Sequence, residues 1–164
     1  MKLYLVQHGE AAAKTENPDR PLTRQGRQDV KRVAVFLHKA GIEVHQIRHS
    51  GKRRAEETAA ILAEQLVPPG GTALLPGLGP DDDVRRVAEL LNRETRPLML
   101  VGHRPFMDRL ASLLVAGSPD RSVVQFRPGG VVCLEQEHKT RAWSLAWAVT
   151  PELLPRRVAP KSLT

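Results

Sequence analysis

The sequence opens with a short apolar run that ends on a histidine and a glycine. Leu3 to Val6 are apolar in succession, which is typical of a strand buried on both faces, and Gly9 ends the run. Open α/β sheets bind their ligands at the carboxyl ends of their strands, so His8 is expected where side chains act on ligands. Taken alone, the stretch favours a histidine that merely caps a core strand, and only partners elsewhere in the chain reverse that interpretation.

Strands and helices alternate from this first strand up to about Gly117. Thr23 is a predicted helix N-cap, and apolar residues at helical spacing follow it up to Gly41. Ser50 is predicted to cap a second helix that ends near Leu66, and Pro105 to begin a later one. A third helix is expected after Asp81–Asp83, and the strands between the helices are predicted at Val44–Arg48, Ala73–Leu75 and Leu98–Val101.

The C-terminal part of the sequence has strand patterns without helices between them. Pro128-Gly129-Gly130 predicts a hairpin, and the three expected strands are Val123–Phe126, Val131–Leu134 and Trp143–Val149. Together with the preceding alternation, this order predicts an α/β fold of three layers, α/β/α. A mostly parallel central sheet would carry helices on both faces, and the C-terminal strands would lie at its edge.

Length and composition suit one domain. The 164 residues, 41% of them hydrophobic, predict a single domain over residues 1–154, followed by a loosely ordered tail over residues 155–164. The one cysteine, Cys133, excludes an internal disulfide and a multi-cysteine metal site. No apolar run approaches the ~20 residues of a membrane span, and the N-terminus lacks the layout of a signal peptide. We therefore expect a cytoplasmic protein that does not bind membranes.

The net charge of +7 requires a partner hypothesis, because such a charge attracts polyanions and phosphorylated ligands. Aromatic residues make up only 4% of the chain, and it contains no RNP-like strand, helix-turn-helix signature or zinc-ligand spacing. The basic residues also fall into separate clusters along the sequence. We therefore do not expect nucleic acid as a partner.

Polar side chains from distant parts of the chain are predicted to meet at the carboxyl edge of the sheet. Guanidinium groups bind phosphate oxygens through paired, charge-assisted hydrogen bonds, and backbone N–H groups at helix starts add further donors. A neutral imidazole in such a pocket can attack phosphorus in line and carry the phosphoryl group, without a metal or cofactor. The residues that predict this phosphoryl site are His8, Arg20, Ser50, Arg54 and His103.

Three motifs in this order resemble those of a known family. Gln7-His8-Gly9 follows the first strand, Ser50 stands four residues before Arg54, and a later strand ends in Gly102-His103. In order and spacing they are similar to the histidine phosphatase superfamily, also called phosphoglycerate-mutase-like. The short chain and the stretch Arg20-Pro21-Leu22-Thr23 are most similar to the SixA-type phosphohistidine phosphatases within it.

The resemblance implies a minimal phosphoglycerate-mutase-like fold without an inserted lid, and it assigns roles by position. His8 is the implied phosphorylated nucleophile, Arg20 and Arg54 hold the phosphoryl oxygens, and His103 hydrogen-bonds the same group. Gln7 takes the place of a phosphate-binding arginine of the family. Glutamine keeps an amide donor but has no charge, so phosphate affinity or transition-state stabilisation is expected to fall by ~1–3 kcal/mol.

Many members of the family use a further carboxylate as general acid, and this sequence has no clear equivalent. Gly77 and Gly79 stand in the loop where one is expected, and Glu10 and Asp81–Asp83 are only weak candidates. A phosphoramidate nitrogen leaves readily once it is protonated, so the expected substrate is phosphohistidine on a phosphotransfer protein.

Two alternatives stay open. One is a phosphatase of a small phosphorylated substrate, namely a phosphoester. The other is a phosphate-binding module with little catalysis, because Gln7 replaces the family arginine. The sequence does not indicate the oligomeric state.

Overall fold

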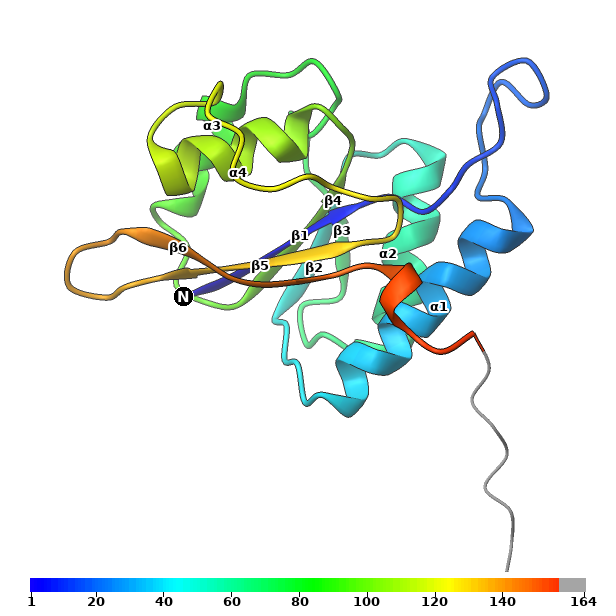
Figure 1. The fold of residues 1–164 in the computed structure, drawn as a ribbon, viewed down its shortest axis with the longest axis horizontal. Coiled ribbons are helices and arrows are strands. Elements are labelled where there is room, and N and C mark those ends of the chain that lie inside the picture. The colour runs from blue at the N-terminus through cyan, green and yellow to red at the C-terminus, as the bar shows by residue number, and fades with distance from the viewer. Residues whose placement is uncertain (157–164) are drawn as a thin grey trace, which may run out of the picture.

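One six-stranded sheet runs through the structure, a computed structural model that describes residues 1–156. The strand order is β3-β2-β4-β1-β5-β6 (Figure 1). The first four of these strands are parallel, whereas β5 and β6 are antiparallel to their neighbours. The bounds are β1 (Lys2–Gln7), β2 (Gln46–His49), β3 (Thr72–Leu74), β4 (Leu98–Gly102), β5 (Val131–Gln136) and β6 (Trp143–Val149).

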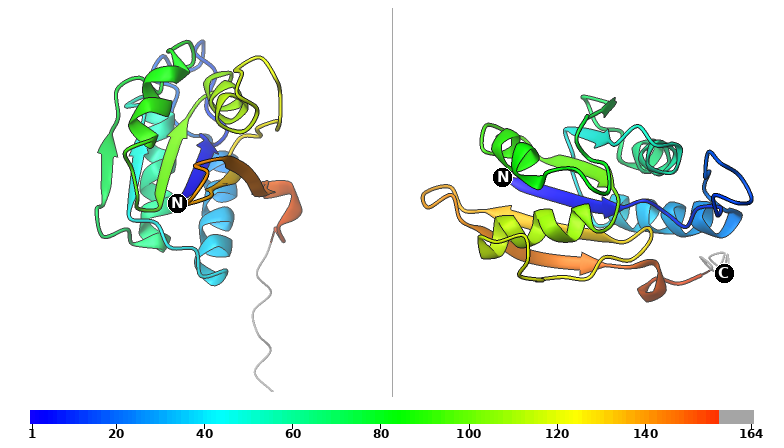
Figure 2. Two further views of the ribbon diagram at one scale, coloured as in Figure 1. Left: turned by 90° about the vertical axis from the view of Figure 1, so that its left-hand side faces the viewer. Right: turned by 90° about the horizontal axis from the view of Figure 1, so that it is seen from above.

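Helices cover both faces of the sheet. One face carries α3 and α4 and the other carries α1 and α2, as the views of Figure 2 show. This arrangement confirms the predicted three-layer α/β fold with a mostly parallel sheet. The helix bounds are α1 (Arg24–Lys39), α2 (Arg53–Leu66), α3 (Val84–Leu91) and α4 (Phe106–Ala116), and a short 3-10 helix covers Pro151–Leu153.

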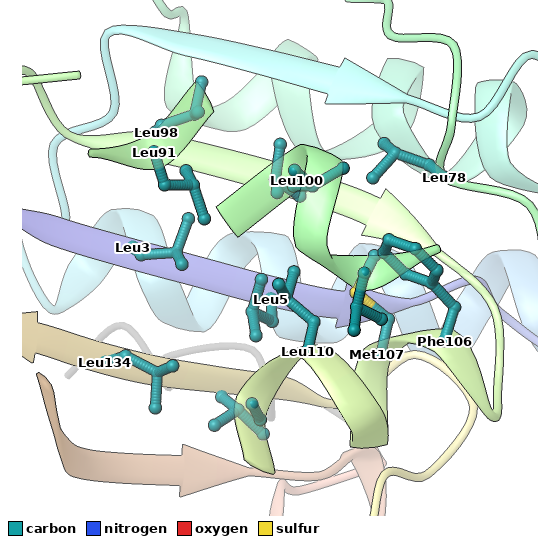
Figure 3. Packing of buried hydrophobic residues seen from close by; sticks show 14 of the residues in the cluster. Leu3, Leu5, Leu78, Leu91, Leu98, Leu100, Phe106, Met107, Leu110 and Leu134 are labelled. Carbon is teal, nitrogen blue, oxygen red and sulfur yellow. The ribbon is translucent and has the colours of Figure 1, made fainter. Parts of the chain in front are cut away.

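The apolar run of β1 is buried on both faces, as the sequence predicts. Leu3 and Leu5 pack in the core under α3 and α4, where Figure 3 shows Leu5 beside Leu110 and Leu3 toward Leu91. Tyr4 and Val6 pack instead under α1 and α2. Successive side chains of a strand point to opposite faces, so one short segment forms the centre of both cores.

The pairing of β1 with β4 brings the two motif histidines to one edge. Gln7 lies opposite Gly102 in the parallel register. His8 and His103 are therefore the residues that directly follow these two neighbouring strands. The His8 N–H donates to the Gly102 carbonyl oxygen at 3.0 Å, which extends the ladder by one bond. The sheet itself therefore positions both imidazoles.

The predicted strand at Val123–Phe126 is wrong, and so is the hairpin predicted at Pro128–Gly130. Residues 123–126 form an irregular segment whose Phe126 is buried under α4. β1 already pairs with β4 on one side and with β5 on the other, so no strand edge is left there for this segment. The hairpin joins β5 to β6 instead.

Helix starts agree with the sequence only in part. Thr23 caps α1 as predicted, with its hydroxyl accepting from the Gly26 N–H. Ser50 does not cap α2, because the helix begins at Arg53 and its N-cap is Lys52. Pro105 is likewise the N-cap residue of α4 and not its first helical residue.

The predicted single domain over residues 1–154 stays a prediction, and most of the predicted tail, from residue 157 on, lies outside the described residues. Among the described helices, none combines the length and apolar character that a membrane span requires.

Candidate functional site

The His8 ring has a defined neutral tautomer. Its Nδ1 lies 2.7 Å from the Gly9 carbonyl oxygen, which can only accept, so Nδ1 carries the proton. Arg54 Nε lies 3.3 Å from His8 Nε2, and a guanidinium can only donate, so Nε2 carries the lone pair. The two contacts leave the lone pair on Nε2 and place this nitrogen beside a cation.

His103 stacks obliquely beside His8, with the ring centroids 5.0 Å apart. Its Nε2 is hydrogen-bonded to the Ser50 hydroxyl at 2.6 Å, and that hydroxyl also accepts from the Lys52 N–H at 3.3 Å. His103 Nδ1 is buried without a partner among residues 1–156. Ser50 therefore orients His103, a role that a local capping rule could not reveal because the two residues are 53 positions apart.

Arg54 is placed by a hydroxyl bridge between α2 and the end of β1. The Thr58 hydroxyl donates to the Arg54 carbonyl oxygen at 2.7 Å and accepts from the Gly9 N–H at 3.0 Å. A Cβ on Gly9 would lie only 2.8 Å from Cγ2 of Val30, so the close approach requires glycine here. The threonine and the glycine of the motifs thus fix the distance between Arg54 and His8.

Arg20 lies in the loop between β1 and α1, where its backbone adopts a left-handed conformation with φ 48°. This conformation is uncommon for a residue other than glycine. The loop is held by the Arg20 N–H, which donates to the Asn17 carbonyl oxygen, and by Arg20 Nε, which donates to the Ala12 carbonyl oxygen, each at 3.0 Å. The positive charge of Arg20 contributes to lowering the pKa of both His8 and His103.

Glu57 ties the loop that carries Arg20 to the helix that carries Arg54. Its carboxylate accepts from the Leu22 N–H at 2.7 Å, from Arg53 Nε at 3.1 Å and from a terminal nitrogen of Arg27 at 2.9 Å. Burial alone would raise the pKa of Glu57, but these donors outweigh it and the pKa is lowered. The sequence did not single out Glu57, because its spacing on an amphipathic helix does not distinguish it from a solvent-facing residue.

Gln7 is buried at the end of β1, with 9% of its surface exposed. Its Oε1 is buried, and its side chain makes no hydrogen bond to any residue in the described part of the chain. The backbone carbonyl of Gln7 accepts from the Gly129 N–H at 3.0 Å. The structure thus brings together His8, Arg20, Arg54 and His103. The side chain of Gln7, which directly precedes His8, has no polar partner among the described residues.

The pocket keeps both imidazoles neutral. Burial is the main cause that lowers the pKa of His8 to about 4, and the charges of Arg54 and Arg20 lower it further against the opposing Gly9 hydrogen bond. Burial also lowers the pKa of His103 to about 3, with contributions from His8, Arg54, Lys52 and Arg20. A cationic pocket of this kind favours an anion.

Three of the four candidate general acids have structural partners, whereas Asp81 is exposed and has none among residues 1–156. A Glu10 carboxylate oxygen accepts from the Thr23 hydroxyl at 3.1 Å, Asp82 accepts from the Gly79 N–H at 2.7 Å, and Asp83 caps α3. Among the described residues, no carboxylate contributes to the pKa shift of His8 or His103. Residues 1–156 also contain no group of three or more side chains placed to ligate a metal.

The His8 assignment predicts a pH titration. Because the pKa of His8 is lowered from 6.5 to about 4, the ring stays neutral on acidification until the pH falls through about 4. Between these values the unfolded chain binds more protons than the folded one, so folding weakens as the pH falls through this window. Nitrogen-15 NMR of the imidazoles, with His8→Ala for assignment, should show a protonated Nδ1 and a midpoint near 4. A midpoint at or above 6.5 would contradict the assignment.

Comparisons with known proteins agree with this geometry. The family model of the histidine phosphatase superfamily (branch 1) matches residues 3–73. An uncharacterized protein of Picosynechococcus is 36% identical over 124 residues, which cover 71% of this chain and 74% of that protein. The phosphohistidine phosphatase SixA of Escherichia coli is 25% identical over 151 residues, which cover 89% of this chain and 94% of SixA.

Solved structures share the fold. A structure of the protein histidine phosphatase SixA with tungstate has a TM-score of 0.82 at 23% identity and covers 93% of this chain and 99% of that one. A mycobacterial glucosyl-3-phosphoglycerate phosphatase has a TM-score of 0.69 at 18% identity and covers 89% of this chain and 98% of that one. The chain belongs to the histidine phosphatase superfamily, a family of phosphatase hydrolases, and its fold is of the SixA type.

Proposed function

We propose that the protein hydrolyses phosphohistidine on a partner protein, through a covalent intermediate on His8. The observation that carries this proposal is the neutral His8 ring, whose Nε2 has the lone pair and lies beside the Arg54 guanidinium. The similarity to a protein named phosphohistidine phosphatase supports the choice of substrate. The partner we propose is a phosphohistidine-containing phosphotransfer protein.

The first step transfers the phosphoryl group to the enzyme. His8 Nε2 attacks phosphorus in line and forms a new P–N bond, while the P–N bond of the substrate breaks and its imidazole leaves with the proton it carries. Arg54 and Arg20 provide the positive charge at the equatorial oxygens, so we propose no metal or cofactor for this step. His103 would hydrogen-bond the same oxygens through Nε2, which in the structure contacts the Ser50 hydroxyl and would exchange it for a phosphoryl oxygen.

The second step hydrolyses phospho-His8. A water molecule attacks phosphorus on the side opposite Nε2, the bond between phosphorus and Nε2 breaks, and inorganic phosphate leaves. The Nδ1–H bond to the Gly9 carbonyl holds the ring in place through both steps. The protons that the water loses pass to the phosphate and to solvent.

The positions of the candidate general acids indicate which leaving group the site favours. Glu10, Asp82 and Asp83 accept hydrogen bonds that hold the loops. Asp81 is exposed on the loop between β3 and α3, and no hydrogen bond or ion pair of the described residues places its carboxylate at the His8 ring. An alcohol leaving group needs a proton from such an acid, whereas the imidazole of phosphohistidine can bring its own. This difference favours phosphohistidine over a small phosphoester.

One observation favours a second candidate function, phosphate binding with little catalysis. Gln7 stands where the family has an arginine, and its buried Oε1 finds no donor among residues 1–156. The pocket then has one cation fewer for the transition state, although Arg20 and Arg54 remain.

The direct test is phosphate release from a phosphohistidine-carrying phosphotransfer domain at neutral pH, without added metal. The native protein should release phosphate, and His8→Ala should release none above the uncatalysed rate. Release that persists in His8→Ala would refute the covalent role of His8. If the native protein binds inorganic phosphate but releases none from the domain, the binding-module alternative is favoured.

Gln7→Arg should raise the rate of phosphate release from the same domain. A guanidinium restores a charge-assisted hydrogen bond to the phosphoryl group, worth about 1.4 kcal/mol or roughly tenfold in rate. Ser144→Arg is the matched control, since it adds the same charge at an exposed position of β6, far from the site. A rate in Gln7→Arg equal to or below that of the native protein would show that the missing charge does not limit turnover.

A further inference from the structure

A hollow of about 530 Å³ lies beside the phosphoryl pocket, between the start of α2 and the loop that joins β3 to α3. We call it the flank groove. Ser50 lines the groove, and its hydroxyl is also hydrogen-bonded to His103 at 2.6 Å. The groove therefore adjoins the catalytic pocket. Lys52 also lines the groove and acts electrostatically on His103. The residues that line the groove are Ser50, Gly51, Lys52, Leu74, Gly77, Gly79, Pro80, Asp81 and Asp82.

The groove has an apolar floor. Leu74, the last residue of β3, is 59% exposed, which is unusual for a large apolar side chain beside a polar site. Its Cδ1 occupies the space that a Cβ on Gly51 would need, at 2.5 Å, so Leu74 lies directly against the Ser50–Lys52 turn. Gly77 and Gly79 have no side chains to cover it. An apolar side chain of a partner could therefore bury Leu74.

Side chains of both charges line the groove. Lys52 lies two residues after Ser50, and Asp81 and Asp82 lie on the β3–α3 loop. The Asp82 carboxylate accepts from the Gly79 N–H at 2.7 Å and so shapes the loop. Asp81 is exposed and makes no hydrogen bond or ion pair with residues 1–156. Its carboxylate is therefore available to a cation on a bound molecule.

We propose that the flank groove binds the polypeptide next to the phosphohistidine of a protein substrate. An apolar side chain of the substrate packs on Leu74, and a lysine or arginine of the substrate pairs with Asp81. Free phosphohistidine would occupy the phosphoryl pocket and leave Leu74 and Asp81 uncovered, whereas the polypeptide of a protein substrate would extend over them. The two aspartates of the groove are a local negative charge on a chain of net charge +7. They favour a substrate that has a basic residue near its phosphohistidine. This inference rests on the proposed function and deepens it.

The test compares two substrates with one set of variants. The substrates are free phosphohistidine and a phosphorylated histidine phosphotransfer domain that has a lysine or arginine and a leucine close to its histidine. Leu74→Asp and Asp81→Lys should each lower kcat/KM on the domain by about tenfold and leave kcat/KM on free phosphohistidine within about twofold. Leu153→Asp, at a leucine that is 73% exposed elsewhere on the surface, is the matched control and should change neither value.

The outcomes separate the two proposals. If Leu74→Asp and Asp81→Lys act on the domain as the native protein does, the flank groove is not a substrate-binding surface. If the folded variants lose activity on both substrates equally, Leu74 and Asp81 support the phosphoryl pocket itself and the proposal is wrong. Asp81 is exposed, so Asp81→Lys gives a valid answer even if Leu74→Asp does not fold. A native protein inactive on both substrates would instead refute the proposed function.

Discussion

The hydrogen bond from His8 Nδ1 to the Gly9 carbonyl oxygen is the interaction on which the chemistry of this protein depends. It fixes the proton on one nitrogen, so the other has its lone pair toward Arg54 Nε. Burial makes this neutral form persist to a pH near 4. A protonated ring could not attack phosphorus, and a ring free to turn would present either nitrogen. In the mechanism we propose, the bond thus makes a buried histidine a directed nucleophile.

The remaining parts of the site are positioned by packing that links distant segments. Parallel pairing of β1 and β4 sets His103 beside His8, and Ser50 fixes the second ring at its Nε2. Thr58 bridges α2 to the Gly9 N–H, while Glu57 binds the loop that carries Arg20. Both arginines are thereby held before any ligand arrives. Such preorganisation lowers the cost of assembling charge around a transferring phosphoryl group.

The sequence predicts those features that follow from local patterns. Local rules recognise the apolar runs of the two strands that precede His8 and His103, and the helical spacing after the cap residue Thr23. Glycine residues that follow the apolar runs mark where these elements end. Local rules do not reveal partners across the fold. Ser50 binds His103 and does not cap α2, and Phe126 is buried although its segment forms no strand. The electrostatic role of Glu57 likewise arises only when α2 meets the loop after β1.

The most direct measurement of the central claim is the position of the phosphoryl group on a trapped enzyme intermediate. The native protein would be mixed with a phosphohistidine domain, quenched rapidly in alkali, and examined by phosphorus-31 NMR and by mass spectrometry of the His8 peptide. The account predicts a phosphoryl group on Nε2 of His8, since Nδ1 donates to Gly9. Phosphorylation of Nδ1, of His103 or of no histidine, in an enzyme that releases phosphate, would contradict it.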